Sequence, residues 1–96
     1  MTVDPVLDDE ALAAALAGLP AWTMRDGGLH RELVFADFTA AFAFMTGLAA
    51  VAERLDHHPD WSNAWNKVVI DIISHAAGGV TARCVELADA ADELAG

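Results

Sequence analysis

Basic residues are few in this sequence. It contains five Lys and Arg residues against fifteen Asp and Glu residues, and its formal net charge is −10. Proteins that bind nucleic acid or anionic membranes use Lys and Arg to displace counterions. We therefore expect neither nucleic acid nor a membrane as a partner.

Tyrosine is absent and cysteine occurs once. The four histidines therefore carry most of the side-chain proton chemistry near neutral pH. The single cysteine, Cys84, excludes an intramolecular disulfide. The start of the chain lacks the charged and apolar segments of a signal peptide, and no uninterrupted apolar run is long enough to span a membrane. These absences together predict a cytoplasmic protein.

Apolar residues, in contrast, are abundant and make up 55% of the chain. A chain of 96 residues forms one domain, here residues 1–96, and buries only about two-thirds of the surface that it exposes when unfolded. One small core cannot easily hide so many apolar side chains. We therefore expect the protein to form homo-oligomers.

The first third of the chain predicts a helix and a β-hairpin. Acidic residues precede an Ala- and Leu-rich stretch that ends at Gly18, which is typical of a helix. Apolar and polar residues then alternate from 21 to 35 around Asp26-Gly27-Gly28, which indicates two strands joined by a glycine turn. On the second strand we expect His30 to be an exposed structural residue.

A long apolar helix is predicted from Phe38 to Leu55, with Asp37 as its N-cap. Apolar residues form two adjacent stripes along this helix, so it has to be covered twice. We expect one side to pack on the sheet and the other on a neighbouring subunit. Gly47 would permit close helix approach at that second contact.

Pro59 ends this helix, and two further strands follow at 61–65 and 68–74. A Gly-rich loop then leads to a final helix for which Thr81 is the expected N-cap. The order α-β-β-α-β-β-α predicts an α+β fold, an antiparallel sheet with helices on one face. Of the three tryptophans, we expect Trp22 and Trp65 to lie in the core and Trp61 to face a pocket.

Three of the four histidines gather at two places, His57-His58 at the helix end and His75 after the last strand. Imidazole has an unperturbed pKa of about 6.5, so it gives and takes protons near neutral pH. If the last strand returns beside the helix end, these side chains line one pocket. Such a group suits general acid-base catalysis of a reaction on a small molecule.

Three alternatives compete with acid-base catalysis. A metal site is one, since Glu53 and His57 lie four residues apart on a helix and two further histidines could add nitrogens. The sequence, however, has neither His-x-x-x-His nor Cys-x-x-Cys. Nucleophilic catalysis by Cys84 is another, although a lone cysteine among apolar neighbours is usually buried. In the third, the histidines only form hydrogen bonds at the helix end.

One set of motifs resembles the pterin-4a-carbinolamine dehydratase family. The motifs are Ala52-Glu53-Arg54-Leu55-Asp56-His57-His58-Pro59-Asp60-Trp61, Asn66-Lys67-Val68, Ser74-His75 and Gly78-Gly79-Val80-Thr81. The similarity extends to Trp22, to 31–35 and to Asp37-Phe38, and so covers essentially the whole chain. Its most specific part is Glu-x-x-x-His-His-Pro with the downstream Ser-His and Gly-Gly-x-Thr.

The resemblance implies a four-stranded antiparallel sheet with three helices on one face. It also implies homodimers or homotetramers that form through sheet edges and the long helix. The implied reaction removes water from 4a-hydroxytetrahydropterin to give quinonoid dihydropterin, in the recycling of tetrahydrobiopterin. The family needs no metal or redox cofactor for this step.

By the same resemblance, His57 and His75 correspond to histidines that approach the 4a-hydroxyl and protonate it as it leaves. His58 corresponds to one that orients the pterin and shares its proton traffic. Glu53 would support the histidines, and Ser74 would lie near the pterin edge. The implied catalytic residues are His57, His58 and His75; the implied substrate-binding residues are Glu53, Pro59, Trp61 and Ser74; no metal ligand is implied.

Three positions depart from the family pattern. Ala76 and Cys84 stand where the family commonly has acidic residues, and Trp65 replaces a tyrosine. An acid at position 84 would cap the last helix and help to orient His75, so its loss weakens both. Because all three histidines are retained, we expect reduced activity rather than none. These departures leave a second hypothesis open, a catalytically weak or inactive member that acts as a dimerisation or assembly module for other proteins.

Overall fold

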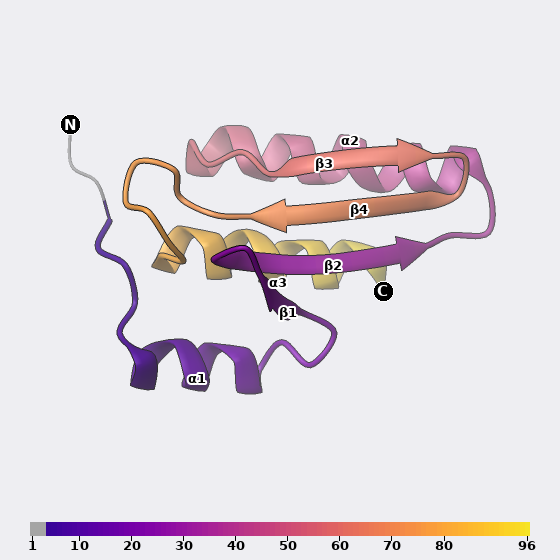
Figure 1. Ribbon diagram of the computed structural model, residues 1–96. Coiled ribbons are helices and arrows are strands. Elements are labelled where there is room, and N and C mark those ends of the chain that lie inside the picture. Colours follow the sequence, from indigo (N-terminus) through magenta and orange to yellow (C-terminus); the bar gives the residue numbers. More distant parts are fainter. Residues whose placement is uncertain (1–3) are drawn as a thin grey trace.

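The computed structural model describes residues 4–96 (Figure 1). Its elements are α1 (Asp9–Ala17), β1 (Thr23–Arg25), β2 (Gly28–Val34), α2 (Phe38–Leu55), β3 (Asp60–Ala64), β4 (Lys67–Ile72) and α3 (Ala82–Ala95). Their order is the predicted α-β-β-α-β-β-α. The predicted helix N-cap at Asp37 is also present, because its carboxylate accepts a hydrogen bond of 2.8 Å from the amide of Ala40.

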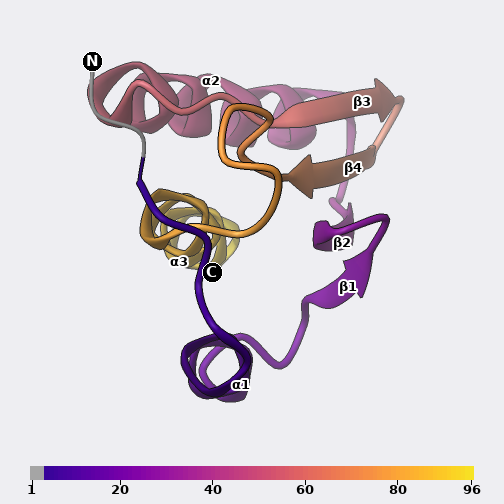
Figure 2. The same cartoon turned by 60° about the vertical axis from the view of Figure 1, so that its left-hand side comes forward.

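The four strands form one antiparallel sheet in the order β1-β2-β4-β3. Hairpins join β1 to β2 and β3 to β4, whereas α2 carries the chain from β2 across to the far edge strand, β3. Figures 1 and 2 show the three helices on one side of this sheet, with α2 and α3 against the strands and α1 beyond α3. The predicted α+β fold is confirmed.

The sheet has one covered face and one open face. Val68, Ile70 and Ile72 of β4 are completely buried beneath α2 and α3, as the alternation of the strand requires. Val69 and Asp71 point to the other side and remain only partly buried. No helix of residues 4–96 covers that other side, which we call the open face.

Helix α2 presents a buried and an exposed stripe. Its buried residues are Ala41, Phe44, Leu48 and Ala52, which pack in the core. Phe38 and Phe42 on the outer stripe are 49% and 55% exposed. The packing of one side on the sheet is thus confirmed, and the covering of the other by a second subunit stays a prediction. By length and composition α2 is also apolar enough to cross a membrane, as the core helix of a soluble protein can be.

Gly47 does permit close helix packing, but within this chain. A Cβ at Gly47 would lie 3.1 Å from a methyl group of Leu94 in α3. The expected role of Gly47 at a subunit contact is therefore replaced by a role between α2 and α3. A lone helical glycine carries no information about which neighbour it meets.

Two side-chain predictions were wrong. His30 is 8% exposed rather than solvent-facing, because it lies on the open face between the carboxylates of Asp71 and Glu32. Trp65 is 68% exposed instead of buried, since it occupies the turn between β3 and β4 with a φ of 51°. Trp22, in contrast, lies in the core as predicted.

Candidate active site

The end of α2 holds the His57-His58 pair in a fixed backbone conformation. Asp56 adopts the left-handed conformation that ends the helix, with a φ of 50°. The amide of His57 then donates a 3.0 Å hydrogen bond back to the carbonyl of Ala52. Pro59 follows directly and bars further helix, so the chain turns into β3.

A tight loop after β4 brings His75 to the same place. The amide of Ser74 donates to the carbonyl of Gly79 at 2.9 Å, and the amide of Gly78 donates to the carbonyl of Ser74 at 2.7 Å. The hydroxyl of Ser74 accepts a hydrogen bond of 3.1 Å from the amide of Ala77. The loop therefore has one defined conformation, which projects His75 beside the end of α2.

These two segments enclose a hollow of about 270 Å³, which we call the histidine hollow. Its lining residues are Asp56, His57, His58, Ile73, Ser74, His75 and Ala76. The structure thus brings together all three predicted catalytic histidines and one predicted substrate-binding residue. The remaining predicted residues, Glu53, Pro59 and Trp61, lie outside the lining.

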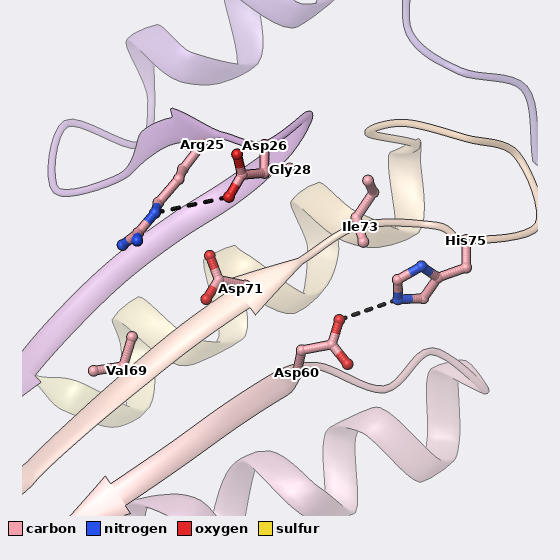
Figure 3. A pocket seen from close by; sticks show the side chains of 8 residues that line it. All are labelled: Arg25, Asp26, Gly28, Asp60, Val69, Asp71, Ile73 and His75. Atoms are coloured by element: carbon pink, nitrogen blue, oxygen red, sulfur yellow. Dashed lines mark hydrogen bonds and ion pairs between the residues drawn. The ribbon is translucent and has the colours of Figure 1, made fainter.

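Each histidine has a different hydrogen-bond partner. Nε2 of His57 lies 3.1 Å from Sγ of Cys84. Nε2 of His58 lies 3.1 Å from a carboxylate oxygen of Glu53, one helix turn before it. Nε2 of His75 lies 3.1 Å from a carboxylate oxygen of Asp60, as Figure 3 shows. Two imidazoles are therefore supported by carboxylates and one by a thiol.

Burial separates His57 from the other two histidines. The removal of its ring from water, followed by the positive charge of Arg83, lowers the pKa of His57 below its ordinary value of 6.5. His57 is consequently neutral near neutral pH. The side chains of His58 and His75 are 56% and 77% exposed.

A second and larger hollow of about 610 Å³ adjoins the first on the open face of the sheet. It shares His75 and Ile73 with the histidine hollow, and Val69 and Ile73 supply its apolar lining. Its polar lining includes Asp60 and Asp71 (Figure 3). A flat ligand that reaches from one hollow to the other would pass the ring of His75.

Pro59 and Trp61 line neither hollow, so the prediction that Trp61 faces this pocket is wrong. Trp61 pairs with Ile70 across β3 and β4, so its side chain lies on the covered face, packed against the core. Glu53 reaches the site only through His58. Among residues 4–96, no three His, Cys, Asp or Glu side chains are arranged to hold a metal ion.

The sequence analysis missed three residues of the site, Asp56, Asp60 and Ile73. Asp60 lies inside the His-His-Pro-Asp-Trp motif, so its proximity to a histidine was a usable signal. The expectation that residue 84 acts on His75 was also wrong. Cys84 contacts His57 rather than His75, and Thr81 directs its hydroxyl to Cys84 without capping α3 by a side-chain hydrogen bond.

Comparison with known proteins identifies the family. Residues 5–94 match the family model described as pterin 4 alpha carbinolamine dehydratase. The chain belongs to the pterin-4-alpha-carbinolamine dehydratase family. A protein from Rhizorhabdus wittichii named "Putative pterin-4-alpha-carbinolamine dehydratase" is 48% identical over 99% of both chains. A relative of the same name from Solibacter usitatus is 47% identical over 93% of this chain and 94% of its own.

The fold of this dehydratase-family chain also occurs in a crystal structure. The protein from Brucella melitensis named transcriptional coactivator/pterin dehydratase superposes with a TM-score of 0.91 at 36% identity. The match covers 95% of this chain and 99% of that one. Both the family and the fold predicted from the motifs are therefore confirmed.

Proposed function

We propose that this protein is an active dehydratase that removes water from 4a-hydroxytetrahydropterin to give quinonoid dihydropterin, in tetrahydrobiopterin recycling. The observation that carries the proposal is the histidine hollow, where three imidazoles from two distant segments line one space. A chain that had kept only the fold would have no need of three proton-transfer groups at one site.

The reaction requires two proton movements. A carbinolamine carries its hydroxyl on the carbon next to an amine nitrogen, so loss of water forms a C=N bond. The hydroxyl needs one proton to leave as water, and the nitrogen gives one up. An acid and a base placed on either side of the ring supply both without net proton uptake, and each contributes about 10²- to 10⁴-fold.

The hydrogen-bond partners suggest how the histidines divide this work. His75 and His58 each direct Nε2 to a carboxylate, which leaves Nδ1 to exchange protons with the substrate. We assign the acid to His75, whose charged form would be paired with Asp60, and the base to His58. His57, which is neutral, holds the leaving hydroxyl by a hydrogen bond.

The substrate-binding residues then act at different distances. Ser74 lines the hollow and would lie beside the pterin edge. Glu53 orients His58, and Pro59 with Trp61 fixes the path from the histidines into β3. We further propose that the protein works in the cytoplasm, without cofactor, as a homodimer or homotetramer whose contacts include the exposed stripe of α2.

The test is the stopped-flow rate of 4a-hydroxytetrahydropterin dehydration, compared with the spontaneous rate. We expect acceleration by the native protein and its loss in the His57→Ala/His75→Ala variant, with circular dichroism unchanged. His30→Gln is the matched control, because His30 lines neither hollow and glutamine can still bond to Asp71. Native protein that leaves the spontaneous rate unchanged would refute the proposal.

A second candidate is a protein-binding module without useful activity. Two observations favour it. The Brucella melitensis neighbour is named a transcriptional coactivator as well as a dehydratase, and Phe38 and Phe42 expose a pair of aromatic rings on α2. No acceleration in the stopped-flow test, together with a stable complex that Phe38→Ser/Phe42→Ser abolishes, would establish this alternative.

A further inference from the structure

A buried chain of hydrogen bonds ties His57 to the start of α3. Sγ of Cys84 lies 3.1 Å from Nε2 of His57, and the hydroxyl of Thr81 lies 3.5 Å from the same sulfur. Cys84 and Thr81 are 0% and 1% exposed, so water does not replace these partners. Each of the two contacts needs one donor and one acceptor. The hydrogens of the imidazole, the thiol and the hydroxyl therefore have to satisfy both contacts at once.

The hydroxyl of Thr81 decides their direction. Thr81 occupies the N-cap position of α3 without a side-chain hydrogen bond to the helix backbone, and its hydroxyl is directed to Cys84. If the thiol donated to Thr81 instead, the buried hydroxyl hydrogen would have no acceptor among residues 4–96, and a buried donor without a partner costs about 1–3 kcal/mol. The hydroxyl therefore donates to the sulfur, and the thiol hydrogen is left for His57.

We propose that Cys84 is a positioning residue that holds His57 with its ring hydrogen on Nδ1. A thiol that donates to Nε2 requires Nε2 to be the unprotonated nitrogen. Among residues 4–96 the structure gives Nδ1 no hydrogen-bond partner, so its N–H is the group that remains for a ligand. A carboxylate at position 84 would only accept hydrogen bonds and would place the hydrogen on Nε2 instead.

The consequence for catalysis rests on the proposed function. His57 donates a hydrogen bond to the 4a-hydroxyl and takes no proton from the substrate, which leaves proton exchange to His58 and His75. The imidazole beside a thiol, His57, therefore differs in its role from the two beside carboxylates, His58 and His75. The contact with His57 also gives Cys84 a role that could not be inferred from its departure from the family pattern.

The charged groups around His57 do not replace this contact. Arg83 comes from α3, Asp4 from the N-terminal segment, and Asp56 and His58 from the helix end. Arg83 and Asp4 pair with each other at 3.3 Å. Within the described part of the chain, the ring of His57 forms no hydrogen bond with any of the four. The thiol is therefore the group that selects the protonated nitrogen.

The direct test is two-bond ¹H–¹⁵N NMR of protein labelled in its histidines, which reports which ring nitrogen carries hydrogen. The His57 signals are assigned by their loss in His57→Asn. We expect Nδ1 to be protonated in the native protein and in Cys84→Ser, whose hydroxyl can also donate. In Cys84→Asp we expect the hydrogen on Nε2. A native His57 with its hydrogen on Nε2 would overturn the inference.

The kinetic test uses a side chain that imitates only the Nδ1–H group. The amide nitrogen of asparagine takes the place of Nδ1, so His57→Asn should keep dehydration within about tenfold of native. His57→Ala removes the donor and should lose about 100-fold or more, as for the loss of one preorganised hydrogen-bond donor. Equal losses in the two variants would contradict a pure donor role. Melting temperatures of both variants check that they remain folded.

The two tests separate the inference from the proposed function. The NMR measurement needs no substrate, so it decides the position of the hydrogen even in a protein that fails to accelerate dehydration. A native protein without activity but with Nδ1–H on His57 would refute the proposed function and leave the role of Cys84 intact. An active protein with the hydrogen on Nε2 would do the reverse.

Discussion

The indole of Trp22, before β1, donates a 2.8 Å hydrogen bond to Oδ1 of Asp92 in the last turns of α3. The guanidinium of Arg31 in β2 donates to the same oxygen. Trp22 is buried, and the Arg31 side chain is 20% exposed. Asp92 therefore joins the edge hairpin to the C-terminal helix at a site largely removed from water.

Replacement of Asp92 by alanine should destabilise the fold. Asp92→Ala leaves a buried indole N–H and a largely buried guanidinium without their acceptor, for which we expect a loss of about 2–4 kcal/mol in the free energy of unfolding. Urea denaturation followed by tryptophan fluorescence measures it. Glu93→Ala on the exposed side of the same helix is the control. A loss below about 0.5 kcal/mol, the range of ordinary surface substitutions, would contradict this account.

The carboxylate of Asp89 should have the opposite effect. Burial first, and then the charges of Asp92, Glu93 and Glu86, raise the pKa of Asp89 above its ordinary 3.8. A raised folded-state pKa means that the native state binds the proton more tightly, so the charged form destabilises the fold at neutral pH. Asp89→Asn should therefore raise the melting temperature near neutral pH. The gain should begin to fall as the pH drops through the raised folded-state pKa, and it should vanish below the ordinary value of 3.8.

The size of the Asp89 effect should depend on salt. Asp89 is exposed, so the gain is small, below about 1 kcal/mol. Repulsion among exposed carboxylates is screened as ionic strength rises. The part of the gain that comes from these charges should therefore fall in molar salt, and a gain that persists unchanged would leave burial as its only cause.

His57 should make stability depend on pH in the mildly acidic range. Because burial lowers its pKa in the folded state, the unfolded chain binds the proton more tightly, and stability falls as the pH drops below the ordinary value of 6.5. His57→Asn removes this ionisation, so its melting temperature should vary less with pH over that range. Parallel curves for native protein and variant would mean that burial does not perturb His57.

Loss of the carboxylate beside His75 should reduce turnover without unfolding the protein. In Asp60→Asn a neutral amide replaces the carboxylate beside Nε2, so the ring can keep a hydrogen bond but loses the negative charge that supports its protonated form. We expect the stopped-flow dehydration rate to fall by about tenfold, less than removal of His75 itself. The Asp60 side chain is 66% exposed, so the melting temperature should stay within a few degrees of native. An unchanged rate would exclude Asp60 from the site.

The close contact between α2 and α3 offers a stabilising substitution. A Cβ at Gly47 would meet Leu94 at 3.1 Å, but Leu94 is 45% exposed in the last turn of α3 and has room to shift. Within a helix, alanine is also more favourable than glycine by about 1 kcal/mol. Gly47→Ala should therefore raise the melting temperature, and Gly47→Leu should lower it. A decrease with alanine would show that Leu94 cannot move.

Much of this architecture follows from local sequence. The N-cap at Asp37, the glycine turn at 26–28 and the block at Pro59 act on neighbouring residues, so they place element ends without reference to the rest of the chain. The alternation of Val68, Ile70 and Ile72 likewise names the covered face of β4. The motif around His57 and His58 identifies the family.

The sequence by itself therefore determined the order of the elements and the fold class, and it named the three histidines that line one hollow. Tertiary structure alone decided their partners, because contacts such as His57 with Cys84 and His75 with Asp60 join segments 27 and 15 residues apart. It buried His30 between two carboxylates, exposed Trp65 on a turn, and turned Gly47 towards α3. Periodicity assigns a side chain to a face; only the packed chain supplies what lies opposite.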